Sequence, residues 1–295
     1  MRHWITKHPL VTYFLLAYGI TWVLLSPLVL QQWRVIGIIV PPVWSGIGAL
    51  GPITAAFLTA TLSGGKAAIA DLISGMTRWR VGLLGWGLAL SPVLLFLVAL
   101  GVLPLLGQPF PDPARLSSSA VGAPWLFAGL LASVVYGIGE EPGWRGFALP
   151  RLQRRWNALL ATTVLTGLWA CWHAPFFVYR FQFGPGEVIG FVTSLYAGAL
   201  WLTFVYQVTG GSTLVTMIWH MLWNAVIAVG MVLSPLLAAI LSTLMIIIGV
   251  LVIFIGKPGS LAGSVPRVVY PKETATLPVP TARRTSSGQP SSIAR

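Results

Sequence analysis

Charged residues are scarce in this chain. They make up 8% of its 295 residues, whereas hydrophobic residues make up 56%. A soluble domain contains about 25% charged residues, so this composition excludes an ordinary soluble fold. The chain also has 14 Trp and 32 Gly residues. Trp lines membrane interfaces and Gly is frequent in membrane helices, so we predict an integral membrane protein built as one helical bundle.

Cysteine and acidic residues are rare as well. The single cysteine, Cys171, excludes an intramolecular disulfide and a zinc site made of several cysteines. Six residues are Asp or Glu against 18 Lys and Arg, which gives a net charge of +12. Such an excess can indicate a nucleic-acid partner. Here the basic residues gather in loops and in a C-terminal tail, so we expect the lipid bilayer and no nucleic acid as a partner.

Long apolar segments cover most of the chain. A helix that crosses a bilayer core needs about 20 consecutive apolar residues. This rule predicts an all-α, polytopic transmembrane helix bundle with about eight spans. The expected spans are residues 10–30, 44–63, 82–104, 123–141, 156–178, 186–208, 211–232 and 234–255. The alternative at the end of the bundle is one kinked segment, because only two residues separate the last two spans.

The basic residues predict how the bundle is oriented. With the N-terminus inside, 15 of the 18 Lys and Arg residues fall in cytoplasmic segments. The three that fall outside are Arg34, Arg115 and Arg180. Cytoplasmic loops carry an excess of Lys and Arg, so we expect both termini in the cytoplasm and an even number of spans. In a bacterium, the membrane would be the plasma (inner) membrane.

Two polar segments lie on the predicted cytoplasmic side. Residues 65–82 have apolar side chains at helical spacing between Ile69 and Met76, which fits a helix on the membrane surface or, alternatively, a polar loop. Residues 257–295 are rich in Pro, Ser, Thr and Arg. Such a composition cannot bury a core, so we predict a transmembrane domain at residues 1–256 followed by a disordered tail.

Two of the six acidic residues stand side by side at the end of an apolar span, in the stretch 140-EEPGWR-145. A charged group at membrane depth costs about 2.5–3.5 kcal/mol on insertion scales, so it normally faces the bundle interior. Arg145 follows Glu141 by four residues, the spacing of an ion pair on one helix face, which leaves Glu140 unpaired. Pro142 is expected to kink or end the helix there and to admit water.

The other candidate site residues inside the predicted spans are two histidines and an asparagine. His173 follows Trp169 by four residues and precedes Pro175 by two, which predicts a second helix interruption. His220 and Asn224 are four residues apart, so they project from one helix face. Because polar groups are costly in a membrane, we expect these residues and the acidic pair to share one site.

A carboxylate, two histidines and an amide are suited to the hydrolysis of a peptide bond. The carboxylate can accept a proton from water as general base, and a histidine can assist it. The other histidine and the amide can donate hydrogen bonds to the oxyanion. Zinc is possible instead, held by Glu140, His173 and His220. We favour the metal-free version, because Asn224 is a poor zinc ligand but a good oxyanion donor.

Three motifs, in this order, resemble the CAAX protease and bacteriocin-processing family of intramembrane endopeptidases (CPBP or Abi family), which includes the Ras-converting prenyl-protein endopeptidases. They are Glu-Glu-x-x-x-Arg at 140-EEPGWR-145, aromatic-x-x-x-His at 169-WACWH-173 and His-x-x-x-Asn at 220-HMLWN-224. In the second motif, Trp169 replaces the usual Phe. The motif-bearing core covers residues 120–232, approximately.

The resemblance implies an intramembrane endopeptidase that acts on a membrane-associated, prenylated or secreted peptide. It implies that Glu140 activates water and that His173 assists. His220 and Asn224 would stabilise the oxyanion, or bind a metal if the enzyme is a metalloendopeptidase. The remaining motif residues would support the site: Glu141, Arg145 and Trp169.

Two other kinds of function fit an apolar bundle with buried polar residues. A proton-coupled transporter can also use Glu, His and Arg in its relay. Transporters often contain internal repeats with paired broken helices, and we find no such repeat in this sequence. A catalytically silent membrane scaffold is the other alternative, and the intact motif residues argue against it. Cleavage of a peptide by the purified protein would separate an enzyme from both.

Overall fold

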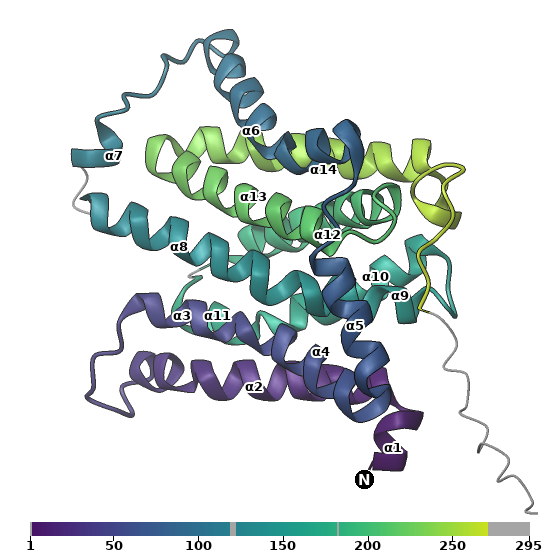
Figure 1. Ribbon diagram of the computed structural model, residues 1–295. Helices are drawn as coiled ribbons and strands as arrows, with labels where there is room; N and C mark the ends of the chain where they lie inside the picture. Colours follow the sequence, from purple (N-terminus) through teal and green to yellow (C-terminus); the bar gives the residue numbers. More distant parts are fainter. Residues whose placement is uncertain (1, 119–121, 182, 271–295) are drawn as a thin grey trace, which may run out of the picture.

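The chain is all-helical wherever its structure is described. The structure is a computed structural model, and it describes residues 2–118, 122–181 and 183–270, in which no strand occurs. The helices labelled in Figure 1, together with two irregular helices η1 and η2, are α1 (Arg2–Lys7), α2 (Pro9–Gln32), η1 (Pro42–Trp44), α3 (Ser45–Gly48), α4 (Leu50–Ser63), α5 (Gly65–Met76), α6 (Gly82–Leu105), α7 (Arg115–Ser118), α8 (Gly122–Glu141), η2 (Pro142–Ala148), α9 (Leu149–Leu152), α10 (Ala158–Trp172), α11 (Ala174–Tyr179), α12 (Pro185–Val208), α13 (Thr213–Leu233) and α14 (Pro235–Ser260).

The long helices agree with the prediction of about eight spans. Among the residues that the structure describes, six segments are long and apolar enough to cross a membrane: α2, Pro42–Ser63, α6, α12, α13 and α14. Two further helices occupy the other expected spans, α8 with 20 residues and the shorter α10 with 15. Ser234 separates α13 from α14, so the last two spans are two helices and not one kinked segment.

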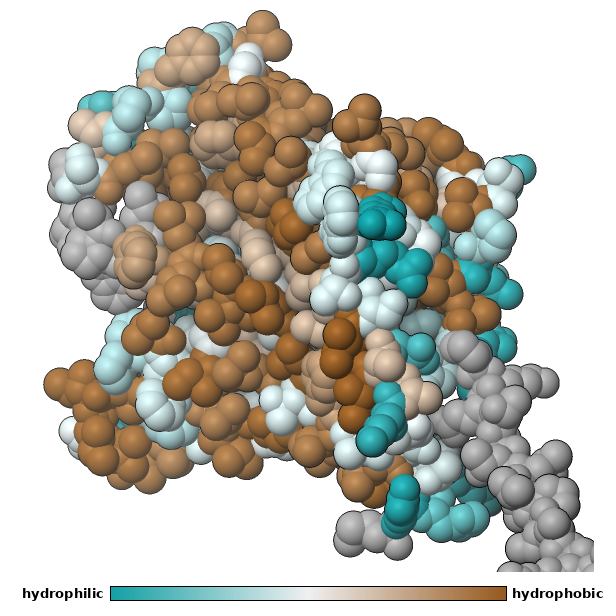
Figure 2. Space-filling model, viewed as in Figure 1, coloured by the Kyte–Doolittle hydropathy of each residue, from teal (hydrophilic) through white to brown (hydrophobic). Residues whose placement is uncertain are grey.

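The outer surface of the bundle is apolar. Large hydrophobic side chains are exposed on its helices, among them Leu83 at 93% and Phe254 at 79% of full exposure. Figure 2 shows hydrophobic residues over most of the visible face, with hydrophilic residues gathered on the side where α1 and α5 lie. Water would penalise so large an apolar surface, whereas lipid accepts it. The protein is therefore an integral membrane protein.

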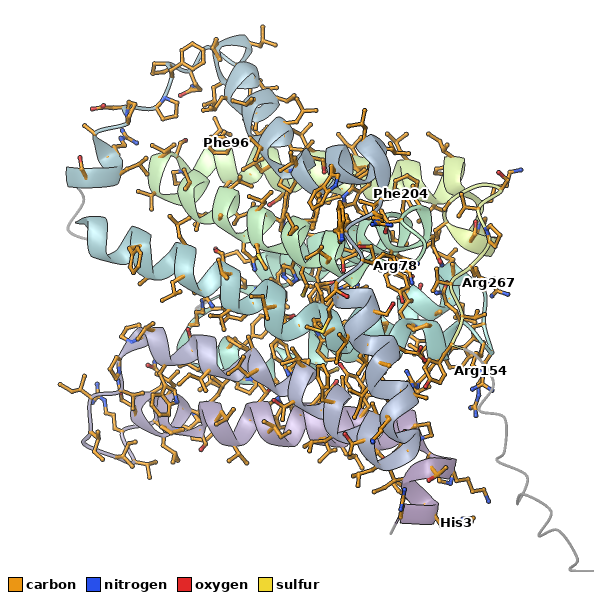
Figure 3. The ribbon with its side chains drawn as sticks, viewed as in Figure 1. His3, Arg78, Phe96, Arg154, Phe204 and Arg267 are labelled. Atoms are coloured by element: carbon orange, nitrogen blue, oxygen red, sulfur yellow. The ribbon has the colours of Figure 1, made fainter. Side chains whose placement is uncertain are left out.

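Basic segments gather at one end of the bundle. Figure 3 shows His3, Arg78, Arg154 and Arg267 at the same end, although they lie far apart in the sequence. All four belong to segments that the sequence places in the cytoplasm. The helix arrangement thus brings these predicted cytoplasmic segments to one end of the bundle. That this end faces the cytoplasm stays a prediction.

Aromatic side chains form the core beneath the candidate site. Tyr13 of α2, Trp144 and Phe147 of η2, and Trp169 and Trp172 of α10 are all less than 5% exposed and belong to one hydrophobic cluster. The Tyr13 ring meets the edge of Trp144 with centroids 5.7 Å apart. Rings packed from three elements hold η2 and the end of α10 in fixed positions.

The α-helix ends at Glu141, just before Pro142, as predicted, but the chain stays helical beyond it. Glu141 keeps helical dihedral angles (φ −62°, ψ −38°), and residues Pro142–Ala148 continue as a π-helix. Pro142 lacks an N–H and its ring clashes with the preceding turn of an α-helix. The wider π turn relieves that clash and is frequent at functional sites. Gly143 allows the close contact here, because a Cβ atom at this position would lie 2.5 Å from the Tyr13 hydroxyl.

Residues 65–82 contain a helix, which was one of the two expectations for this segment. α5 covers Gly65–Met76 and buries Ala68, Leu72 and Gly75. Leu72 belongs to the same cluster as the aromatic core, while Ile73 is 47% exposed. One face of α5 therefore packs on the protein. A location on the membrane surface stays a prediction.

The first part of the predicted tail is packed and not disordered. α14 extends to Ser260, and residues 261–270, which we call the C-terminal strap, then cross the basic end of the bundle. The Val268 N–H donates to Gln207 Oε1 at 2.6 Å, and the Val268 carbonyl accepts from Gln153 Nε2 at 2.9 Å. Two glutamines bind the strap through its backbone, which composition cannot reveal. Residues 271–295, the rest of the predicted tail, lie outside the described residues.

Candidate active site

Four elements bring the predicted site residues together. Glu140 and Glu141 are the last residues of α8, and Arg145 lies one turn later in η2. The remaining site residues come from the end of α10 and the middle of α13, and α13 packs along α8 (Figure 1). The helix interruption predicted near Pro175 is present, because α10 ends at Trp172 and α11 begins at Ala174. His173 therefore lies at the junction of two helices.

Glu141 is the charged centre of the site. Its Oε1 atom accepts from Arg145 Nη1 at 2.7 Å and lies 2.8 Å from His220 Nδ1. Glu141 and Arg145 are both 0% exposed. The ion pair that the spacing predicted is therefore present. The bond to His220 was not predicted, and it ties the end of α8 to α13.

Glu140 has a different environment. It is 2% exposed, and its Oε2 atom accepts from Trp169 Nε1 at 2.7 Å and from Trp144 Nε1 at 3.0 Å. Within the described residues, Glu140 takes part in no salt bridge. Both donors are neutral. The two glutamates therefore have different partners, as the spacing predicted: Glu141 pairs with Arg145, and Glu140 pairs with no cation among the described residues. Oε2 is thus bound by two indoles, whereas no protein donor holds Oε1 in this part of the chain.

His173 is oriented by its own helix. Its Nδ1 atom lies 2.8 Å from the carbonyl oxygen of Trp169. A carbonyl can only accept, so Nδ1 carries the proton and, in the neutral ring, Nε2 keeps a free lone pair. The ring packs against Trp172 and Phe191, with centroids 4.9 and 5.2 Å away. This environment fixes the tautomer that can accept a proton through Nε2.

Aromatic residues of α2 support the end of α10 where His173 lies. The Tyr18 hydroxyl donates to the carbonyl of Leu168, and Trp22 Nε1 donates to the carbonyl of Trp172 at 3.2 Å. The last four carbonyls of a helix have no partner within it, and Trp22 satisfies that of Trp172, while Tyr18 binds the carbonyl one position before those four. The position of His173 is therefore set by α2 as well as by α10.

His220 and Asn224 lie one turn apart on α13. Because the Glu141 carboxylate accepts, His220 Nδ1 donates to it, and His220 Nε2 is left for another partner. His220 is 6% exposed, whereas Asn224 is half-buried. The Asn224 amide makes no side-chain hydrogen bond to any other residue that the structure describes. Its donors are therefore available to a ligand.

Trp169 contacts Glu140, Arg145 and both histidines of the site. Besides donating to Glu140, its ring lies 4.6 Å below the guanidinium carbon of Arg145. The ring centroid is 5.9 Å from that of His173 and 5.8 Å from that of His220. The resemblance implied only a supporting role for Trp169, and the sequence gave Trp144 no role. The four-residue spacing of Trp144 from Glu140 was the signal available for the second indole.

The residues that we proposed as zinc ligands do not gather as a metal site. In the described part of the chain, no three His, Cys, Asp or Glu side chains form a group that could hold a metal ion. The Trp169 ring packs against both His173 and His220. Glu140, His173 and His220 therefore do not fit a shared zinc ion in this arrangement.

Comparison with known proteins agrees with the motifs. Residues 122–226 match the family model described as type II CAAX prenyl endopeptidase Rce1-like. No curated protein matches the chain. The matched segment contains every candidate site residue, from Glu140 in α8 to Asn224 in α13. The resemblance drawn from the three motifs is therefore confirmed: over residues 122–226 this chain is similar to the Rce1-like CAAX prenyl endopeptidases.

Proposed function

We propose that this protein is an intramembrane endopeptidase that hydrolyses a peptide bond of a membrane-associated, prenylated or secreted peptide. The single observation that carries the proposal is the different pairing of two adjacent glutamates. Glu141 is neutralised by Arg145 and lies beside His220, whereas Glu140 receives only neutral indole N–H groups. A general base needs a lone pair that no cation occupies, and Glu140 meets that requirement.

In the proposed reaction, Glu140 Oε1 accepts a proton from a water molecule. His173 holds the same water through the lone pair on Nε2. The water oxygen then attacks the peptide carbonyl carbon. The negative charge that develops on the carbonyl oxygen is stabilised by the Asn224 amide and, when the ring carries both protons, by the Nε2–H of His220. Protonated Glu140 finally returns its proton to the leaving amine, so the balance is one water for one bond.

The helix positions fit this division of roles. Glu140 and His173 come from α8 and from the junction after α10, while His220 and Asn224 come from α13. A peptide bond bound between them would have the base on one side and the oxyanion donors on the other. Fixed positions of this kind lower the barrier without reorganisation at the moment of reaction.

Cleavage by the purified protein tests the proposed function. The protein is reconstituted in liposomes and given a library of tagged peptides, each in a prenylated and an unmodified form. We expect defined fragments that accumulate with time and depend on the amount of protein. The prenylated and unmodified pairs show which substrate class is used. Proton movement without any cleavage would favour a transporter, and binding without cleavage would favour a scaffold.

The metal-free mechanism predicts that a chelator leaves cleavage intact. Activity is measured before and after prolonged treatment with a strong zinc chelator and dialysis. We expect an unchanged rate, because Glu140 and His173 activate water and Asn224 supplies an amide donor without a metal. Loss of activity that added zinc restores would contradict the metal-free version.

A further inference from the structure

We propose that Trp169 is a positioning residue that holds the Glu140 carboxylate in the orientation needed to activate water. This inference rests on the proposed function and concerns the same site. The indole N–H of Trp169 makes a 2.7 Å hydrogen bond to Glu140 Oε2. The phenylalanine usual at this place in the motif has no N–H, so this chain contains an interaction that the motif alone does not supply.

Both indoles bind the same oxygen of Glu140. Trp144 Nε1 donates to Oε2 from 3.0 Å, and Trp144 is 0% exposed. Two donors on Oε2 restrict rotation of the carboxylate and direct Oε1 away from them. Hydrogen bonds to a charged group are stronger than neutral ones, and these are shielded from water. Oε1 is thus kept available for the proton.

The position of the Trp169 ring is itself fixed by the charged centre of the site. The Arg145 guanidinium lies over its face, and Arg145 is bound to Glu141. The His220 ring meets the indole at an interplanar angle of 77°. The ion pair therefore orients Trp169, and Trp169 orients the base. Glu141 and Glu140 are therefore linked to each other through Arg145 and Trp169.

Trp169 also contributes through its backbone. Its carbonyl accepts from His173 Nδ1, which sets the tautomer of the assisting histidine. A Trp169→Phe substitution leaves this carbonyl and one aromatic ring in place, and it removes the N–H group together with part of the indole. Compared with the same truncation at another buried tryptophan, the substitution tests the hydrogen bond to Glu140.

A matched tryptophan provides the control. Trp219 of α13 is 1% exposed and donates from Nε1 to Ser91 Oγ at 2.9 Å. Its ring stacks on Trp223 and belongs to a different hydrophobic cluster from Trp169. Trp219→Phe removes a buried indole hydrogen bond of similar length without touching Glu140. Any effect common to the two variants is a general cost of losing such a bond.

The kinetic test measures kcat and KM for Trp169→Phe, Trp219→Phe and Glu140→Gln. Trp169→Phe removes a hydrogen bond to a charged group. We expect this loss to lower kcat by about 10- to 100-fold and to leave KM unchanged. We expect no change in kcat for Trp219→Phe. In the Glu140→Gln background, Trp169→Phe should have little further effect, because no base remains to be positioned.

An infrared measurement tests the same contact without relying on activity. The carboxyl band of Glu140 is identified as the one that Glu140→Gln removes. We expect Trp169→Phe to shift this band and Trp219→Phe to leave it in place. An unchanged band, or an unchanged kcat in a protein that cleaves peptides, would overturn the inference. If the wild type cleaves no peptide, the proposed function fails and the infrared band still decides the role of Trp169.

Discussion

Replacement of Glu140 by Gln is expected to lower the rate of peptide cleavage by about 10²- to 10⁴-fold, the usual effect of losing a general base. The fold should persist, because Gln has the same shape and its amide oxygen can still accept from Trp144 and Trp169. The new amide nitrogen has no lone pair for a proton from water. The loss should therefore appear in kcat, with the yield of folded protein unchanged.

A second carboxylate-to-amide change gives the control for Glu140→Gln. Glu187 lies in the first turn of α12, is exposed and accepts from the backbone N–H of Gly184 at 2.7 Å. Glu187→Gln alters one acidic residue of the chain in the same way, at an exposed position outside the three motifs. Its cleavage rate should equal that of the wild type. Near wild-type activity in Glu140→Gln would end the proposed mechanism.

Removal of Arg145 is expected to destabilise the protein by about 3–5 kcal/mol, the usual cost of leaving a buried charge without its partner. In Arg145→Met, Glu141 keeps only His220, and the Trp169 ring loses the guanidinium that covers it. Folded yield and cleavage should therefore fall together. Thermal unfolding in detergent and the amount of monodisperse protein after purification are the measurements.

Two further variants test whether the destabilisation comes from breaking the Glu141–Arg145 pair or from losing a positive charge in general. Arg154→Met changes an exposed arginine next to α9 and should have little effect on stability. The double variant Glu141→Gln with Arg145→Met removes both charges, so it should recover part of the stability that the single variant loses. A well-folded and fully active Arg145→Met protein would contradict the architectural role of the pair.

Most of the helical bundle could be predicted from hydrophobicity, because the requirement for about 20 apolar residues per span is nearly independent of tertiary contacts. The departures have local physical causes. Pro142 ends the α-helix as expected, but a wider π turn accommodates its ring and keeps the chain helical. The C-terminal strap looks like a polar tail in sequence, and its order depends on Gln153 and Gln207 from distant helices.

The residues of the site could be predicted, because polar groups in a membrane are expected to face one another, but individual contacts could be predicted only at helical spacing. The four-residue spacing of Glu141 and Arg145 predicted their ion pair, which is present. The bond between Glu141 and His220 joins residues 79 positions apart, and the bond between Trp169 and Glu140 joins residues 29 apart. Contacts of this kind depend on how α8, α10 and α13 pack. No periodicity in the sequence reports that packing.

The most direct test of the central claim is peptide cleavage in water enriched in oxygen-18, followed by mass spectrometry of the fragments. If Glu140 activates water, the wild type should place one heavy oxygen in the new carboxyl group of the N-terminal fragment. Under the same conditions Glu140→Gln should give almost no labelled fragment, while Glu187→Gln should give the wild-type amount. Labelled fragments formed at the same rate by wild type and Glu140→Gln would contradict the assignment of Glu140 as the base.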